Sequence, residues 1–445
     1  MSIERSSKKT FKLIEHTKRR LSGFRQSWGM NQQSSIVVRS SETGLIDMIP
    51  KSAKIGIYFS DTGGGHRSAA EAVRDGIASV IEREARTAIK VSLLTQPIVE
   101  HSHPVIQGLV SIYNYLAREH TTWIKYLYHF LHVLRIESSS YHLCYGSYVR
   151  YVLEQQQPSL IIATHPMIAE ALARSRDKVL DSSVKVVVVV TDPNEQLWRA
   201  WACKRADLII APNEIVRRRL IDWDIEPAKI RVLGMPVHPD FLSKPRVSRA
   251  KFLSNLGLAP NVYTVCINSG WAGNAHLLDT YLALAKCSQP VQVVFLCGYN
   301  QRLYQAALSE ARRTGIPTAV LPFFDQMSDL MSAVDVMVTK PGGLTTYQAL
   351  ARRLPLVLDN TIEPMPQEAP TMKMLVNCGM ATRLDRPDDL PKIIDAMQVR
   401  HQASVTLPTT YELNSTDHAI FDIAESILAL QFQDIFAETS IEDVA

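Results

Sequence analysis

Strand-length apolar runs alternate along this chain with stretches in which apolar residues recur at helical spacing. Runs of this length are typical of buried strands, and their regular alternation with helices indicates βαβ units. The runs fall into two successive sets, which predicts an α/β protein with two doubly wound, mainly parallel sheets. The predicted strands are 54–59, 89–94, 159–165, 184–192 and 206–212, followed by 262–270, 290–298, 317–323, 334–343 and 354–360.

A proline-containing seam separates the two predicted sheets. Residues 233–248, LGMPVHPDFLSKPRVS, hold three prolines, a composition typical of a linker or hinge. At 445 residues the chain is also too long for one ordinary core. We therefore predict an N-terminal domain at 51–240 and a C-terminal domain at 245–415. A basic arm at 1–50 precedes them, and a helix with an acidic tail follows at 416–445.

Loops at the carboxyl ends of the predicted strands are the expected ligand sites, because open α/β sheets bind ligands beyond those ends. Two facing sheets would create one cleft with loops from each half. Asn268, Ser269 and Gly298 are candidate binding residues in these loops. The loops lie at 61–66, 164–166, 191–198, 268–274, 297–300, 323–326 and 339–350.

The first glycine loop, SDTGGGHR at 60–67, lies between a predicted strand and a predicted helix. Glycine permits close approach to the backbone, and a helix N-terminus favours an anion or a polar acceptor group. Gly64 and Gly65 are therefore candidate binding residues, and His66 beside them could act as a general base near neutral pH. The glycines could equally serve only the turn, and a lone histidine is often structural.

The second glycine loop, TKPGGLTTYQAL at 339–350, repeats the same arrangement in the second half. Its backbone N–H groups and a threonine hydroxyl could hold a diphosphate. The alternative is a turn that needs glycine for packing. Downstream, Gln367 and Glu368 in EPMPQEAP could bind sugar hydroxyls.

Charge is concentrated at the N-terminus, although the formal net charge is only +4. Residues 1–30 contain eight basic and two acidic side chains, together with apolar residues near one helical face. This pattern favours either an interfacial helix on an anionic membrane or a disordered basic arm. Nucleic-acid binding is less favoured, because no basic patch continues into the predicted domains.

Several classes of protein are disfavoured by composition. The N-terminal thirty residues lack the uninterrupted apolar core of a signal peptide, and the longest apolar runs are too short to span a bilayer. The six cysteines lack C-x-x-C spacing, which argues against a structural zinc or a disulfide framework. These features favour a cytoplasmic protein that lies on a membrane without crossing it.

Aromatic residues are dense between 101 and 150. A pair of packed helices would explain them. Alternatively, Tyr113, Trp123 and Tyr126 could contact a lipid interface, which suits aromatic rings with polar edges.

An ordered set of motifs resembles the monogalactosyldiacylglycerol synthases and the bacterial processive diacylglycerol glucosyltransferases of glycosyltransferase family 28. The resemblance spans about 51–385 and is more specific than either glycine loop. The motifs are SDTGGGHRSAAEA, THP, VVTD, ADLIIAPNEIVRRRLI, IRVLGMPVHPDF, LCGYN, TKPGGLTTYQAL and PMPQEA.

This resemblance implies a GT-B fold, with two facing Rossmann-like domains and an interdomain cleft. It also implies inverting transfer from a UDP-sugar, such as UDP-galactose or UDP-glucose, to diacylglycerol or a related lipid, without a required metal or cofactor. The implied donor contacts are Gly64, Gly65, Phe324 at the uracil, Pro341, Gly342, Gly343, Leu344 and Thr345 at phosphate, Gln348 at ribose, and Gln367 and Glu368 at the sugar.

The implied chemistry is direct displacement, in which an acceptor hydroxyl attacks the anomeric carbon as uridine diphosphate leaves. A base must accept the hydroxyl proton. We expect His66 to be that base, with Asp192 or Asp61 as an orienting group or an alternative base.

Four departures from the family's pattern leave the sugar and the activity open. Gln348 stands where relatives have a ribose-binding glutamate, Thr371 replaces a sugar-contacting asparagine, and His238 replaces an arginine. TDPNEQLWRAW lacks the family's histidine but keeps Trp198 and Trp201, which we expect on the acceptor and membrane side. The alternatives are a UDP-sugar epimerase and a catalytically silent membrane-binding homologue.

Overall fold

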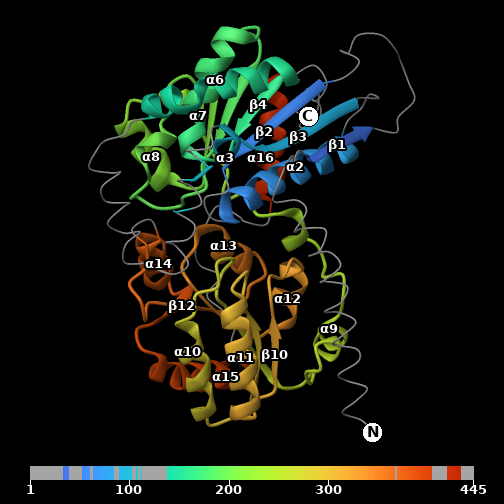
Figure 1. The fold of residues 1–445 in the computed structure, drawn as a ribbon, viewed down its shortest axis with the longest axis vertical. Helices are drawn as coiled ribbons and strands as arrows, with labels where there is room; N and C mark the ends of the chain where they lie inside the picture. The colour runs from blue at the N-terminus through green and yellow to red at the C-terminus, as the bar shows by residue number, and fades with distance from the viewer. Residues whose placement is uncertain are drawn as a thin grey trace, which may run out of the picture. The chain divides into compact units, whose positions relative to one another are not determined.

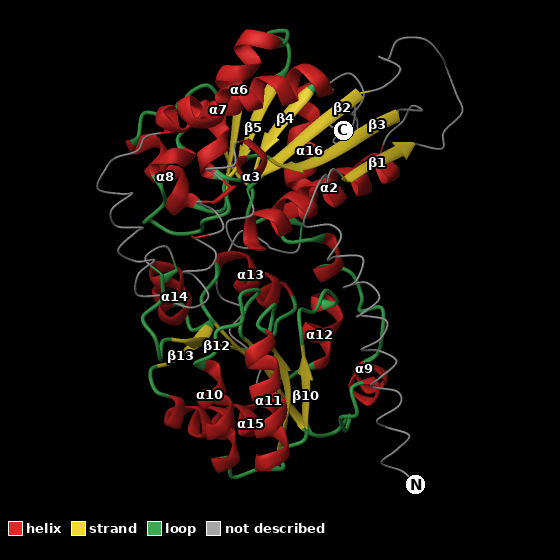
Figure 2. Cartoon of the chain, viewed as in Figure 1, coloured by secondary structure: helices red, strands yellow, loops and turns green. Residues whose placement is uncertain are grey.

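The computed structural model describes residues 34–39, 53–60, 64–84, 90–102, 107–108, 112, 138–365, 368–402 and 418–431. These residues form two compact units, which divide between Leu242 and Ser243. The first unit also includes the last described helix, which follows the second unit in the sequence. Each unit consists of a sheet flanked by helices (Figures 1 and 2).

The described strands of the first unit form a seven-stranded sheet in the order β1-β3-β2-β4-β5-β6-β7. Strand β1 pairs antiparallel with β3 at one edge, and the other neighbours pair in parallel. After β2, the next strand β3 is added on one side of it, and the later strands β4 to β7 are added on the other side. The strands are β1 (Ser34–Arg39), β2 (Ala53–Phe59), β3 (Lys90–Pro97), β4 (Leu160–Ala163), β5 (Lys185–Val189), β6 (Leu208–Ala211) and β7 (Ile230–Val232).

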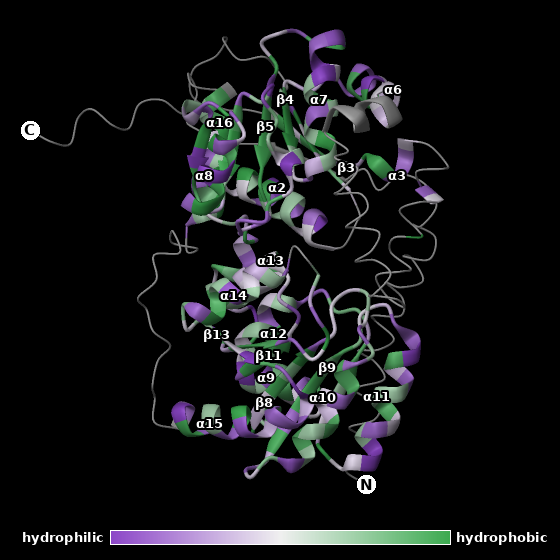
Figure 3. Cartoon of the chain, turned by 90° about the vertical axis from the view of Figure 1, so that its left-hand side faces the viewer, coloured by the Kyte–Doolittle hydropathy of each residue, from purple (hydrophilic) through white to green (hydrophobic). Residues whose placement is uncertain are grey.

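Helices cover both faces of this sheet, because its central strands are apolar on both sides. In β5, Val186 and Val188 pack in one core cluster, while Val187 and Val189 pack in the other. Figure 3 shows β4 and β5 as hydrophobic between the helix layers. The helices are α2 (Gly64–Glu84) and α16 (Ala419–Gln431) on one face, with α3 (Val99–Ser102), α6 (Ser138–Gln156), α7 (Pro166–Val179) and α8 (Glu214–Asp222) packed in the opposite cluster.

The last helix, α16, packs beside α2 although the two are far apart in sequence (Figure 1). A methyl group added at Gly76 would lie 2.7 Å from Cγ1 of Ile420, so glycine is what permits this close approach. The guanidinium of Arg83 lies 4.9 Å from the ring centre of Phe421. The last helix therefore completes the core of the first unit.

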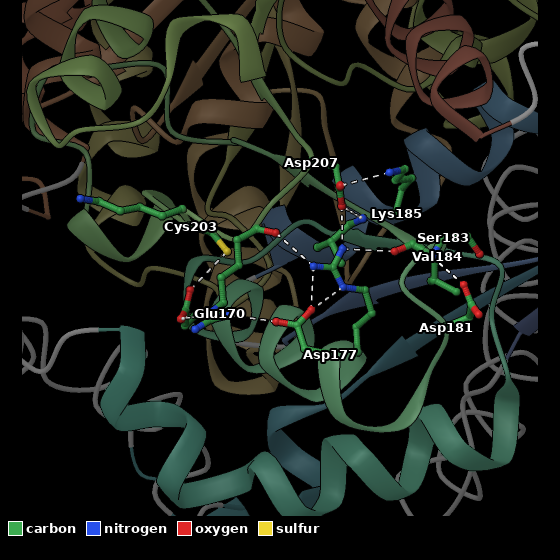
Figure 4. A network of polar contacts seen from close by, with 12 residues as sticks. Glu170, Asp177, Asp181, Ser183, Val184, Lys185, Cys203 and Asp207 are labelled. Atoms are coloured by element: carbon green, nitrogen blue, oxygen red, sulfur yellow. Dashed lines mark hydrogen bonds and ion pairs between the residues drawn. The ribbon is translucent and has the colours of Figure 1, made fainter.

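A polar network holds the amino ends of β5 and β6 to the end of α7 (Figure 4). Arg176 donates to Asp207 at 2.7 Å and to the Val184 carbonyl at 3.2 Å. Asp207 also accepts from the Val186 backbone N–H at 2.8 Å. Ion pairs that share backbone partners in this way fix strand ends, and this network lies at the edge opposite the carboxyl ends of the strands.

The described strands of the second unit form a six-stranded parallel sheet in the order β10-β9-β8-β11-β12-β13. Its direction reverses at β8, which lies between β9 and β11. The strands are β8 (Tyr263–Asn268), β9 (Val291–Leu296), β10 (Thr318–Leu321), β11 (Val336–Thr339), β12 (Leu356–Asp359) and β13 (Ala381–Leu384).

The core of the second unit includes side chains from three of its helices, α10, α11 and α15, against the sheet. The helices of the unit are α9 (Arg249–Asn255), α10 (Leu277–Ala283), α11 (Gln301–Thr314), α12 (Met327–Ala333), α13 (Gly343–Ala351), α14 (Ala369–Asn377) and α15 (Leu390–Gln402).

The prediction of two doubly wound Rossmann-like sheets is confirmed, and each of the ten predicted strands corresponds to an observed one. Strands β1, β7 and β13 were not predicted. Among the described residues, no helix has both the length and the apolar character needed to cross a bilayer.

Candidate active site

The first candidate site lies where the chain direction reverses in the first sheet, between the carboxyl ends of β2 and β4. Ligands of doubly wound sheets bind at such a point. His66 lies in the first turn of α2, which follows β2. Its Nδ1 is 2.9 Å from the carbonyl oxygen of Thr164, directly after β4, and 3.2 Å from the hydroxyl of Thr191, after β5. Loops from three neighbouring strands therefore converge on one imidazole.

The contact with Thr164 fixes the tautomer of His66. A carbonyl oxygen can only accept a hydrogen bond, so Nδ1 must carry a proton and donate it. In the neutral ring the lone pair then belongs to Nε2. A neutral imidazole in this tautomer can accept a proton at Nε2 without giving up its bond to Thr164.

The charge state of His66 is governed by its surroundings. Burial lowers the pKa of His66, and the Asp192 carboxylate and the Thr164 carbonyl oppose part of that shift. Asp192 itself accepts a hydrogen bond from the indole Nε1 of Trp201 at 2.7 Å. The imidazole is therefore kept in its basic form near neutral pH, while a carboxylate is available to stabilise it when it gains a proton.

A second imidazole, that of His165, packs against His66. The two ring centres are 4.3 Å apart, and the rings meet edge to face. His165 caps α7, because its Nδ1 accepts from the Met167 N–H at 3.2 Å. Burial, with the neighbouring His66, lowers the pKa of His165 well below its usual value. His165 therefore acts as a neutral helix cap that supports the ring of His66.

The glycines beside His66 belong to the helix rather than to the turn before it. Helix α2 begins at Gly64, so Gly64 and Gly65 form its first turn and both are exposed. A Cβ added at Gly65 would meet nothing within 4 Å. Packing within the described residues therefore does not require glycine at position 65, which leaves the approach of a ligand as a physical reason for it.

The second candidate site lies at the reversal point of the second sheet, between the ends of β8 and β11. Asn268 accepts from the Gly270 N–H at 3.0 Å, and the hydroxyl of Ser269 donates to the Leu296 carbonyl at 2.5 Å. A Cβ at Gly298, where φ is +56°, would overlap the carbonyl oxygens of Gly270 and Trp271. These three predicted residues thus shape the loops after β8 and β9.

The glycine loop after β11 leads into α13. Pro341 and Leu344 are buried, whereas Gly342, Gly343 and Thr345 are partly exposed. Gly342 is the N-cap of α13 and supplies no side-chain hydrogen bond to the first turn. Backbone N–H groups at such a helix start suit a phosphate oxygen.

An ion pair borders this loop. The Nζ of Lys340 lies 2.7 Å from Oε1 of Glu368, the residue that precedes α14. A Cβ at Gly342 would be 3.7 Å from that carboxylate oxygen and 3.9 Å from Cε of Lys340. The ammonium of Lys340 and the carboxylate of Glu368 therefore lie beside the predicted phosphate-binding glycines.

Other predicted donor contacts lie around the same edge of the sheet or beneath it. Phe324 follows β10 and meets the ring of Phe252 edge to face, with centres 6.2 Å apart. Gln348 is buried in α13. Thr371, which stands in place of the family's sugar-contacting asparagine, is buried in α14.

His238, which stands in place of the family's arginine, is held within the first unit. Its Nε2 is 2.8 Å from Oδ2 of Asp75, and its Nδ1 accepts from the Asp240 N–H at 3.1 Å. Burial raises the pKa of Asp75, but hydrogen bonds from His238 and Arg74 outweigh this effect and lower the pKa to about 2. His238 is therefore a partner of an ionised carboxylate in this conformation.

The structure differs from the prediction for Trp201. Its side chain is fully buried, and its indole N–H bonds Asp192, so it supports the His66 site from within rather than facing a membrane. Trp198 is partly buried and packs against the same core cluster. Five other predicted residues lie outside the described part of the chain, namely Asp61, Gln367, Tyr113, Trp123 and Tyr126.

Three residues of these sites were not predicted as functional: Thr164, Thr191 and Lys340. All three directly follow strands, or nearly so, and each lies within a motif quoted above. The rule that ligands bind at carboxyl strand ends could have identified them. Among the described residues, no group of three or more His, Cys, Asp and Glu side chains is arranged to hold a metal ion.

The match to a family model falls within the first unit. The family model described as monogalactosyldiacylglycerol (MGDG) synthase matches residues 66–237. Monogalactosyldiacylglycerol synthase 1 of Arabidopsis thaliana is 29% identical over 352 residues, covering 77% of this chain and 64% of that protein. The Spinacia oleracea synthase is 27% identical over 388 residues, covering 83% and 72%.

Solved structures agree on the fold. The UDP complex of S. aureus MnaA aligns with a TM-score of 0.54 at 10% identity, over 88% of this chain and 99% of that one. A glycosyltransferase from Rickettsia africae gives 0.50 at 10% identity, over 87% and 99%. A UDP-GlcNAc 2-epimerase from Methanocaldococcus jannaschii gives 0.51 at 11%, over 84% and 99%.

At these identities the structural neighbours indicate only the GT-B type of fold, whereas the sequence relatives indicate the family. The ordered motifs, the model match that begins at His66, and relatives aligned over most of the chain agree with one another. This chain is therefore similar in sequence to the monogalactosyldiacylglycerol synthases over most of its length.

Proposed function

We propose that the protein is an inverting hexosyltransferase that moves a sugar from a UDP-sugar to the hydroxyl of diacylglycerol or a related lipid. One observation carries the proposal. The family match over residues 66–237 begins at His66 and includes Thr164, Thr191 and Asp192, which surround that imidazole. The matched segment thus contains a base with its orienting groups.

His66 acts as the general base. Its Nδ1–H remains bonded to Thr164, and Nε2 takes the proton of the acceptor hydroxyl. The hydroxyl oxygen forms a bond to the anomeric carbon while the bond from that carbon to the phosphate oxygen breaks, and uridine diphosphate leaves. Asp192 stabilises the imidazolium that results. A single displacement inverts the configuration at the anomeric carbon.

The second unit binds the donor. The first turn of α13 binds the diphosphate through Gly343, Leu344 and Thr345, and Phe324 borders the uracil. Support comes from position, because the glycine loop follows β11 at the reversal point of the sheet. Donor sugars of this class are UDP-galactose and UDP-glucose.

Membrane association belongs to the same proposal. Residues 1–30 carry eight basic and two acidic side chains and lie outside the described part of the chain. Their charge suits an anionic lipid surface, at which each basic residue contributes about 1 kcal/mol before screening. The relatives whose names specify chloroplasts are plant proteins, so the compartment of this chain stays a prediction.

The test is incubation of the full chain with labelled UDP-galactose or UDP-glucose and vesicles that contain diacylglycerol. A labelled, alkali-sensitive glycolipid that requires both substrates supports the proposal. Interconversion of the UDP-sugar without lipid would instead indicate an epimerase. Absence of UDP binding and of any product, in protein that is folded, would indicate a silent homologue.

A further inference from the structure

The ion pair between Lys340 and Glu368 has a specific place in the second unit. Lys340 directly follows β11, the strand beside the reversal point, and Glu368 directly precedes α14. Their charged atoms are 2.7 Å apart, with side chains that are 38% and 13% exposed. The carboxylate is thus largely withdrawn from water, and the ammonium satisfies part of its need for a partner.

The stem of Lys340 runs between two glycine loops. A Cβ added at Gly270 would be 3.5 Å from Cε of Lys340, and one at Gly342 would be 3.9 Å from the same atom. Gly270 has a φ of +74°, a backbone conformation that residues with a side chain rarely adopt. The backbone at Gly270 and at Gly342 therefore lies beside the lysine side chain without a Cβ of its own. The loop with Gly342 leads into α13.

Lysine is a mobile cation on a flexible stem, and its ammonium binds phosphate as readily as carboxylate. A diphosphate at the first turn of α13 would bring more negative charge to Lys340 than Glu368 does. In this structure the carboxylate of Glu368 accepts from the ammonium of Lys340 at 2.7 Å.

We propose that Lys340 and Glu368 form an exchangeable pair: on binding of a nucleoside diphosphate sugar, the ammonium moves from the carboxylate to the diphosphate, and Glu368 accepts hydrogen bonds from the sugar hydroxyls. This inference rests on the proposed function for the identity of the donor. The released carboxylate is compensated by neutral donors of the sugar, and the leaving diphosphate gains a cation.

Exchange predicts opposite effects of removing the two charges. In Lys340→Met the diphosphate loses a charge-assisted contact, so affinity for UDP should fall by about tenfold or more. In Glu368→Gln the competing carboxylate is absent, so affinity for UDP should rise severalfold. The same variant should lose the extra affinity that a sugar confers, which lowers the ratio of UDP-glucose to UDP affinity. A purely structural ion pair would instead make both variants change UDP binding in one direction.

The experiment is titration calorimetry of the full chain with UDP, UDP-glucose and uridine. Lys286 and Asp388 provide the matched control, because they form an exposed pair in the same unit with the same 2.7 Å separation. Lys286→Met and Asp388→Asn should leave all three affinities unchanged. Lys340→Arg should retain most of the UDP affinity, and uridine binding should not respond to any of these changes because uridine lacks phosphate.

Opposite shifts in UDP affinity for Lys340→Met and Glu368→Gln support the exchange. Equal shifts, no shift, or a parallel loss of uridine binding overturn it. A wild-type chain that does not bind UDP overturns both this inference and the donor assignment. The transfer assay is separate: opposite shifts in UDP affinity without any lipid product would leave the exchange standing and reject the proposed transferase activity.

Discussion

Replacing Gly65 by alanine should stabilise the protein and yet impair its activity. The residue lies in the first turn of α2, and a methyl group there would meet nothing within 4 Å. Alanine exceeds glycine in helix propensity by about 0.8–1.0 kcal/mol in a helix interior, and less is gained in a first turn. We take about 0.5 kcal/mol as the expected gain, which corresponds to a rise in melting temperature of roughly 1–2 °C for a unit of this size.

Gly76, in the same helix, is the matched control with the opposite expectation. A methyl group there would lie 2.7 Å from Cγ1 and 3.2 Å from the carbonyl oxygen of Ile420, so α16 would have to shift. Overpacking of this kind costs about 1–3 kcal/mol, against a propensity gain of about 1 kcal/mol. Gly76→Ala should therefore lower the melting temperature, by up to about 8 °C, while the activity of the folded fraction is retained.

The assays are thermal and denaturant unfolding of both variants, followed by transfer from a UDP-sugar to lipid. If a ligand approaches the backbone at Gly65, the added methyl group should reduce kcat/KM by about tenfold or more, equivalent to about 1.4 kcal/mol of transition-state stabilisation. A Gly65→Ala protein that is more stable and fully active would refute the idea that this glycine serves a ligand. A Gly65→Ala protein that is less stable would contradict the expected gain from helix propensity at position 65.

Four further predictions concern the first unit and the basic arm. His66→Gln should lower transfer by about 10²- to 10⁴-fold with little change in UDP affinity, because the proposed base is lost while the proposed diphosphate and uracil contacts lie in the other unit. Calorimetry and turnover check this together. Since burial lowers the pKa of His66, wild-type kcat/KM should hold as pH falls to about 6.5 and decline only below it, and the residual activity of His66→Gln should lack that decline. Burial also lowers the pKa of His165, so below about pH 6.5 the unfolded chain takes up a proton that the folded chain excludes. The free energy of unfolding should therefore fall as the pH drops. His165→Asn, which keeps a capping side chain, should weaken this dependence, as measured by urea unfolding at pH 5 and 7. Deletion of residues 1–30 should reduce sedimentation with anionic vesicles, most clearly at low salt, while UDP affinity stays unchanged.

Most of the fold was predictable because buried parallel strands leave a strong signal. Ten apolar runs correspond to strands in the two sheets. The strands that were not predicted lack that signal. Strand β7 has only three residues, and β13 is at the sheet edge with three of its four residues partly or fully exposed. A short or half-exposed edge strand is held by its neighbour, so its own sequence need not be apolar.

The candidate sites were predictable in place but not in detail. The strand-end rule indicated both glycine loops, and His66 does lie where loops from β2, β4 and β5 meet. Trp201 was predicted on the acceptor and membrane side, but its side chain is fully buried. An indole in the core and an indole at a lipid interface have the same sequence signal. The pair of Lys340 and Glu368 joins residues 28 positions apart, and only the fold brings such residues together.

The choice between a transferase and a sugar epimerase depends on the first unit. Structural neighbours with TM-scores of 0.50 and 0.51 include one enzyme of each kind, so the fold does not discriminate between them. An epimerase would need carboxylates flanking the sugar. Here Asp192 accepts from Trp201 at Oδ2 and acts electrostatically on His66, and the tautomer of His66 leaves Nε2 as a base. A lone imidazole nitrogen backed by a carboxylate suits the removal of one proton from an acceptor hydroxyl, which is the step that a transferase requires and an epimerase of a bound sugar does not.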